Sequence, residues 1–308
     1  MLLSVKLLLS LILLAHLVSS EKEKSGNENI KIQRAAVKAW ANQLTETDYN
    51  ATNWDLTMSH SPAHYFEYYI KRLSNVFEEK KASVNFALVG ACDGSHDHTI
   101  SEHYLKNDHW RGVFVEPFEI NYNDLVQYME KSGVGHRTHV IHGAATAKCN
   151  STVIKMKRPT FEERNKSLPH WMRRQIGAVV PFNKLDRPAT GGWTFEYVRC
   201  VNGPEILHDW ALAVAAKQQT SPSSPDIPTK PDGGANIQAA AMLNVQNRAL
   251  RKLRPHILKV DVEGHDYDVL MGFLSNDVPK SDLPLLISFE AKSIMQHIDA
   301  LRSQLHSR

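Results

Sequence analysis

The chain has 308 residues, enough for one large domain or two small ones around a buried core. Apolar residues make up 42% of it and charged residues 22%, a mix that excludes wholesale disorder. With 36 basic and 33 acidic residues, the net charge of +3 gives no electrostatic case for nucleic acid as the main partner. The 3 cysteines exclude a disulfide-dense scaffold and a four-cysteine zinc site.

The N-terminus has the pattern of a targeting segment. Lys6 precedes an apolar run from Leu7 to Val18, and Val18 and Ser20 are small enough for the −3 and −1 positions of a signal-peptidase site. The run is shorter than the roughly 20 apolar residues of a spanning helix. Residues 1–20 are therefore predicted to be a cleaved signal peptide, with a short signal-anchor as the alternative. The expected location is the secretory pathway, with membrane attachment only if the segment is retained.

Three glycan-acceptor triplets begin at Asn50, Asn150 and Asn165. About two such matches are expected by chance in a chain of this composition. The three triplets are compatible with a secreted glycoprotein, but they are not evidence for one.

Residues 21–83 read as a polar linker followed by helices, with apolar stripes at 32–44 and 64–77. Short apolar runs at 85–89, 112–115 and 138–141 predict buried strands, with helices up to Lys106 and over 119–131 between them. Strand, helix, strand, helix, strand with short connections predicts a doubly wound, mostly parallel α/β sheet.

The alternation breaks after the third strand. Residues 149–254 are predicted to form a large insertion before the next strands, at 257–260 and 285–289. Within it, 194–201 resembles a strand, 204–216 and 239–253 resemble helices, and 218–235 is a Pro-, Ser- and Gly-rich loop. A helix is expected over 265–274, and 293–308 ends the chain in a helix-like segment.

Polar and glycine residues gather where these strands end, which is where open parallel sheets bind ligands. The first strand is followed by Gly90-Ala91-Cys92-Asp93-Gly94, the second ends in Glu116, and the fourth is followed by Asp261-Val262-Glu263-Gly264. Each feature alone is weak, because such turns are often structural and acids at strand ends often cap helices.

Taken together, the motifs resemble the FkbM family of S-adenosylmethionine-dependent methyltransferases. The matching stretches are VGACDG (89–94), WRGVFVEP (110–117), HVIHGAA (139–145), LKVDVEGHDYDVL (258–270) and PLLISFE (284–290). In the insertion, LPHWMRRQIGAV (168–179) and FEYVRCVNGPEIL (195–207) are similar to the middle section of eukaryotic-type members. The resemblance implies a Rossmann-like class I methyltransferase domain over residues 84–292 and S-adenosylmethionine as cofactor.

The resemblance also implies roles for particular residues. Gly90, Ala91, Asp93 and Gly94 stand where such enzymes hold the methionine part of the cofactor, and Glu116 where they hold the ribose hydroxyls. Phe118, Gly143 and Ala144 are expected near the adenine. Many class I enzymes have an acid at that third strand, where this chain has His142-Gly143-Ala144.

The chain departs from class I folds at its C-terminal end as well. These folds finish with an antiparallel strand pair, but only 18 residues follow Glu290. We expect either a sheet that stops short at that edge or one completed by part of the insertion.

The expected reaction is methyl transfer to an acceptor hydroxyl, with a glycan or small metabolite as acceptor. Asp261, Glu263 and His265 follow the fourth strand and are the candidate catalytic residues. Glu263 is the preferred base for the hydroxyl proton, and the alternative is that it caps the next helix. A non-catalytic binding module with this fold is the competing interpretation, and an NAD enzyme is disfavoured because Gly-x-Gly-x-x-Gly is missing.

Histidine and cysteine patterns add little specific chemistry. His96, His98 and His103 lie near Asp93 and Asp97, but the spacing fits solvated loop histidines better than a metal site, and no metal is expected. Cys149 and Cys200 either pair in an oxidising compartment or remain two buried thiols.

Overall fold

The computed structural model describes residues 6–9, 28–43, 62–95, 100–159, 178–179, 193–219, 255–262, 265–275, 278, 283–290 and 297–307. Its centre is a 6-stranded sheet in the order β1-β10-β9-β2-β3-β4. The strands are β1 (Lys6–Leu9), β2 (Val84–Val89), β3 (Trp110–Glu116), β4 (Thr138–His142), β9 (Ile257–Val260) and β10 (Leu286–Glu290). All except β1 run parallel, which confirms the predicted α/β sheet with a Rossmann-like strand order.

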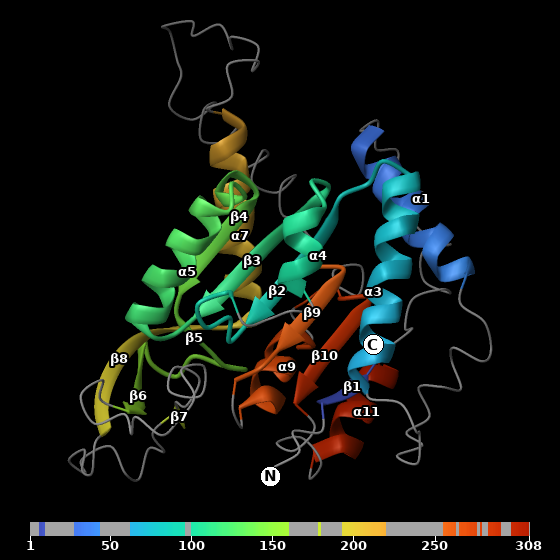
Figure 1. Cartoon of the computed structure of the whole chain (residues 1–308). Coiled ribbons are helices and arrows are strands. Elements are labelled where there is room, and N and C mark those ends of the chain that lie inside the picture. The colour runs from blue at the N-terminus through green and yellow to red at the C-terminus, as the bar shows by residue number, and fades with distance from the viewer. Residues whose placement is uncertain are drawn as a thin grey trace, which may run out of the picture.

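Helices cover both faces of this sheet (Figure 1). Helices α4 (Ile100–Lys106) and α5 (Glu119–Lys131) connect β2 to β3 and β3 to β4 on one face. Helices α7 (Gly203–Gln219) and α9 (Asp266–Phe273) pack against each other on the other face. The remaining helices are α1 (Glu28–Asn42), α3 (Pro62–Glu79), the 3-10 turn η1 (Gly135–Arg137) and α11 (Ile298–Ser307). In the described ranges, no helix is long and apolar enough to cross a membrane.

The apolar runs of the sequence form strands because both faces of the sheet are buried. Every residue of β2 is buried, and Phe86 on this strand packs edge-on against Tyr104 and Phe114 with ring centroids 5.0 and 5.2 Å apart. Gly112 on β3 leaves room for this cluster, since a Cβ there would lie 2.1 Å from the Phe86 ring.

The edge beside β10 corrects a prediction. We expected this edge to stop short or to be completed by the insertion, but Lys6–Leu9 pairs antiparallel with β10, in register from Lys6 opposite Glu290 to Leu9 opposite Ile287. The pattern of residues 1–20 indicates targeting, so sequence reasoning did not consider them as a strand. A strand of four residues also has too few positions to show a strand period.

Between β4 and β9 the chain builds a 4-stranded second sheet in the order β5-β8-β6-β7. Its strands are β5 (Ala144–Ala145), β6 (Val153–Pro159), β7 (Ala178–Val179) and β8 (Trp193–Val201). Only β8 was predicted. The predicted helix over 239–253 and the loop over 218–235 lie outside the described residues apart from the end of α7, so an insertion spanning 149–254 stays a prediction.

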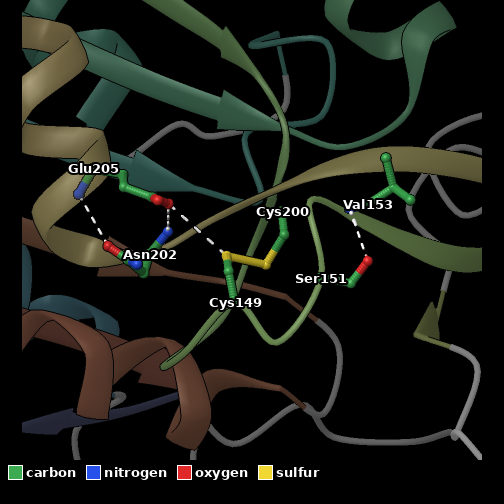
Figure 2. The surroundings of a disulfide bond; sticks show 6 residues. All are labelled: Cys149, Ser151, Val153, Cys200, Asn202 and Glu205. Carbon is green, nitrogen blue, oxygen red and sulfur yellow. Dashed lines mark hydrogen bonds between the residues drawn. A yellow bond between two sulfur atoms is a disulfide. The ribbon is translucent and has the colours of Figure 1, made fainter.

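A disulfide joins Cys149 to Cys200, the last residue but one of β8 (Figure 2). This decides between the two alternatives that the sequence left open. Beside it, Asn202 and Glu205 form a reciprocal cap at the start of α7: the Asn202 amide donates to Glu205 Oε2 (2.9 Å) and the Glu205 amide to Asn202 Oδ1 (3.0 Å). Glu205 Oε2 also lies 3.8 Å from Cys149 Sγ, so the bridge and the cap adjoin.

We predict that replacing both bridged cysteines by serine lowers the free energy of unfolding by about 2–4 kcal/mol, because the bridge closes a loop between residues 51 apart in sequence. Urea unfolding of the wild type and of the double variant measures the difference. Dithiothreitol should destabilise the wild type and leave the double variant unchanged. Equal stability of oxidised and reduced wild type would contradict the prediction.

Candidate functional site

The carboxyl ends of four parallel strands meet at one edge of the large sheet. Beyond the strands, backbone hydrogen bonds continue from Gly90 N to Val115 O (2.9 Å), from Gly143 N to Glu116 O (3.1 Å) and from Asp261 N to Val89 O (2.9 Å). The segments that follow β2, β3, β4 and β9 are therefore neighbours. Open α/β sheets bind ligands at this edge, next to the point where the strand order reverses.

The turn after β2 is shaped by a close backbone approach. Gly90 has φ +82°, and a Cβ on it would lie 2.0 Å from the carbonyl oxygen of Asp261, so only glycine fits. Cys92 follows with φ +52°, a left-handed conformation that is uncommon for a residue with a side chain. The turn is thus held against the end of β9, with Ala91 and Cys92 buried.

Glu116 turns its carboxyl group inward at the end of β3, where it is 3% exposed. Its Oε2 accepts the amide of Cys92 (2.8 Å), and its Oε1 accepts the Phe118 amide (3.1 Å) and the Asn121 side-chain amide (3.2 Å). Cys92, whose backbone is left-handed, thus donates its amide hydrogen to the carboxylate. Glu116 therefore ties the turn after β2 to the turn after its own strand and to α5.

The electrostatics of Glu116 follow from this burial. Desolvation raises the pKa of Glu116 from its usual 4.5 to about 7, against the lowering effect of its three hydrogen bonds and with a further rise from nearby Glu196. Glu196 lies on β8, where its carboxylate accepts the Glu119 amide (2.8 Å) at the start of α5 and pairs with Arg158 Nε of β6 (2.7 Å). The second sheet thus places an acid and a balancing cation next to the site.

Asp93 and Gly94 complete the turn. The Asp93 carboxylate is buried and accepts the Ser95 amide (3.0 Å) and hydroxyl (2.7 Å), which makes an Asx turn. Gly94 has φ +74°, and a Cβ on it would lie 2.6 Å from Leu125 of α5. These contacts explain both residues structurally, and their predicted part in holding a cofactor stays a prediction.

The residues predicted near an adenine lie where β3 and β4 end. Phe118, Ala144, Met156 and Val198 form a small buried cluster that joins the large sheet to the second one. Gly143 is buried, and a Cβ on it would lie 3.1 Å from Val201. Nε2 of His142 lies 3.0 Å from the Pro117 carbonyl oxygen and donates its hydrogen to it, because a carbonyl oxygen can only accept.

The predicted catalytic loop follows β9. Asp261 is partly exposed, with Oδ2 at 4.0 Å from Nζ of Lys259, a buried lysine on the same strand. His265 Nδ1 lies 3.5 Å from Asp268 in the first turn of α9. Glu263, the preferred base, lies outside the described residues, so the structure brings Asp261 to the edge and leaves the place of Glu263 open.

No group of three or more His, Cys, Asp or Glu side chains suited to a metal occurs among the described residues. Of the three loop histidines, His96 and His98 lie outside those residues. His103 stacks on Trp110, with ring centroids 5.9 Å apart, and burial lowers its pKa.

Sequence reasoning assigned no role to several residues of the site. Asn121, Glu196 and Arg158 lie around Glu116, and two of them come from the second sheet. Lys259 lies beside Asp261. Lys259 did have a signal: a lysine inside an otherwise apolar strand two positions before Asp261 suggests a partner at the strand end.

We predict that Glu116 makes stability depend on pH. Because its folded pKa of about 7 exceeds the usual 4.5, the folded protein holds this proton while the unfolded chain has lost it. The contribution of Glu116 to stability should therefore be fully present below about pH 4.5 and be lost as pH rises through about 7, by an amount on the order of 3 kcal/mol. Glu116→Gln has no such proton. Urea unfolding of both proteins between about pH 5 and about pH 8 gives the difference, and a pH-independent difference would contradict the prediction.

Comparison with known proteins agrees with this arrangement. A family model described as the Methyltransferase FkbM domain matches residues 89–308. This range begins at the last residue of β2 and includes every later strand of the large sheet and the helices that follow them. No match was found among curated proteins or solved structures. Because the family model covers well over half of the chain, the protein belongs to the FkbM methyltransferase family.

Proposed function

We propose that the protein transfers a methyl group from S-adenosylmethionine to a hydroxyl group of a glycan or small metabolite. The observation that carries the proposal is the Glu116 carboxyl group, held beside the glycine turn at the carboxyl edge of the sheet in a member of this methyltransferase family. S-adenosylmethionine would supply an electrophilic methyl group, and the protein would supply binding, orientation and a proton acceptor.

The residues at the edge fit such a cofactor. A carboxylate has about four lone-pair positions, and Glu116 uses three of them, two on Oε1 and one on Oε2. One position on Oε2 remains for a ribose hydroxyl. A second hydroxyl would take the place of the Asn121 side-chain amide, the one donor of the three that is not backbone. Gly90, Ala91, Asp93 and Gly94 would then face the methionine part, with Phe118, Gly143 and Ala144 toward the adenine.

The acceptor would lie near the end of β9. In this proposal Asp261 orients the acceptor or the methionine end of the cofactor, and Nζ of Lys259 lies 4.0 Å from its carboxylate. Glu263 takes the proton from the acceptor hydroxyl. His265 is the second candidate for the proton, and its Nδ1 lies 3.5 Å from Asp268. The segment 149–254 would cover this edge and shape the acceptor pocket.

The cofactor assignment is tested with Glu116→Gln. Glutamine keeps the shape but loses the charge that strengthens hydrogen bonds from ribose hydroxyls, so we predict that affinity for S-adenosylhomocysteine falls by about tenfold or more. Calorimetry measures it, with Glu119→Gln on the exposed first turn of α5 as the matched control. Glutamine keeps one of the two acceptor oxygens, whereas alanine leaves the buried amides of both Cys92 and Phe118 without their acceptor.

Two outcomes would contradict the assignment. Unchanged affinity in a folded Glu116→Gln protein would remove the ribose role and make Asp93 the next candidate. Absence of any heat with S-adenosylmethionine or S-adenosylhomocysteine in the wild type would favour a non-catalytic binding module instead.

The proton acceptor is tested by Glu263→Gln. A general base typically contributes about 10²–10⁴-fold to the rate, so we predict a loss on that scale with cofactor affinity within a few-fold of the wild type. Transfer of labelled methyl from S-adenosylmethionine to a panel of saccharides measures activity, and His265→Ala should lose less. Full activity together with a lower unfolding temperature would identify Glu263 as a helix cap.

We also propose entry into the secretory pathway. A disulfide between Cys149 and Cys200 is typical of oxidising compartments, and Asn150, in a glycan-acceptor triplet next to that bridge, is exposed. Cleavage after Ser20 would remove β1 and leave β10 as the edge of the sheet.

Sequencing the N-terminus of protein from a secretory host tests this. We predict a mature chain that begins close to Glu21 and stays folded, since β1 adds a short strand at one edge only. A chain that keeps Met1 and sediments with membranes would identify a signal-anchor. A soluble chain that keeps Met1 would show that β1 belongs to the mature sheet.

A further inference from the structure

The strands β6 and β8 pair antiparallel and present two different faces. Lys155 pairs with Tyr197 and Lys157 with Phe195, so these side chains share one face, while Met156 and Val198 share the other. The second face is buried against Phe118. The first, called the ribbon face here, comprises Val153, Lys155, Lys157, Trp193, Phe195, Tyr197 and Arg199.

The ribbon face concentrates exposed apolar surface. Tyr197 is 67% exposed and Val153 48% exposed, and among the described residues the only other large hydrophobic exposed to this degree is Tyr68. Trp193 and Phe195 are half-buried on the same strand as Tyr197. Single exposed apolar residues are ordinary, but several gathered on one flat face indicate contact with a partner.

Cations lie directly on these rings. The Lys155 ammonium is 4.0 Å from the centroid of Phe195 and 5.9 Å from that of Tyr197, and the Lys157 ammonium is 4.6 Å from that of Trp193. Arg199 adds a third cation, paired with Asp209 of α7 at 2.9 Å. The outward positions of β6 and β8 carry no acid, because Glu196 lies on the opposite face with Arg158. The face is therefore both aromatic and positively charged.

The arrangement of charge and rings limits the kind of partner. A surface that inserts into a membrane exposes apolar groups that reach further out than its cations. Here the ammonium groups of Lys155 and Lys157 lie over the rings of Phe195 and Trp193. Proteins that bind nucleic acids are usually strongly basic, whereas this chain has a net charge of only +3. A strand of seven residues such as β6 spans about 20 Å, enough for several units of an extended polymer.

We propose that the ribbon face binds an acidic glycan chain. Lysine ammonium groups would pair with its carboxylate or sulfate groups, and the exposed aromatic surface would pack against the apolar faces of the sugar rings. This binding does not depend on methyl transfer or on the cofactor. It would hold a polymer on the outer side of the same two strands whose inner side contacts Phe118.

Binding of a sulfated and of a carboxylated hexasaccharide, measured by calorimetry with the full chain, tests the proposal. The double variant Lys155→Gln/Lys157→Gln should bind about tenfold more weakly or worse, and the slope of affinity against salt should fall by about two ions. Tyr197→Ala should cost about threefold to tenfold, with Tyr197→Phe restoring most of the loss. The matched control is Lys106→Gln/Lys131→Gln, which removes two exposed lysines far from the ribbon face.

The results that would overturn the proposal are distinct. Equal weakening by the control pair would show unspecific attraction to charge, and no binding of either hexasaccharide would exclude the glycan. Tighter, Lys155-dependent binding to phosphatidylserine vesicles or to a single-stranded oligonucleotide would assign the face to a membrane or to nucleic acid instead. S-adenosylhomocysteine affinity, measured on the same variants, should stay unchanged, so this proposal and the methyltransferase proposal can fail separately.

Discussion

Glu116 carries its carboxyl group into the interior, where it accepts amide hydrogen bonds from the turn after β2 and from the turn after β3. Removing a carboxylate from water is costly, and here two backbone amides and Asn121 offset part of that cost. Because those donors come from separate segments, the carboxyl group fixes the relative positions of the strand ends. The turn after β2 and the start of α5 are both held to this point.

The second sheet is coupled to the same point by charge and by packing. Glu196 binds the first turn of α5 and is balanced by Arg158, while Phe118 packs among Met156 and Val198. A change at Glu196 or Arg158, on the inner side of the small sheet, is therefore expected to alter the electrostatics of Glu116. The disulfide at Cys200 holds β8, on which Glu196 lies, to the segment before β6.

Much of the fold could be read from the sequence because its signals are local. The strand β9 and the helix α5 were predicted with the bounds that the structure has, since a buried parallel strand shows a short apolar run and an amphipathic helix shows a helical period. The strands β6 and β7 were missed. Lysine and arginine interrupt the apolar residues of β6, and its inner side is buried only by residues distant in sequence, such as Phe118 and Val198.

The sequence by itself determined the succession of parallel strands along the chain, the family, and the gathering of Gly90, Glu116 and Asp261 at strand ends, because parallel strands must end at one edge. Only the tertiary structure decided which donors Glu116 accepts, that Cys149 meets Cys200, and that Lys6–Leu9 lies beside β10. Each of these joins segments far apart in the chain. Such contacts depend on how whole helices and strands pack against one another, and the local pattern of apolar residues does not specify that packing.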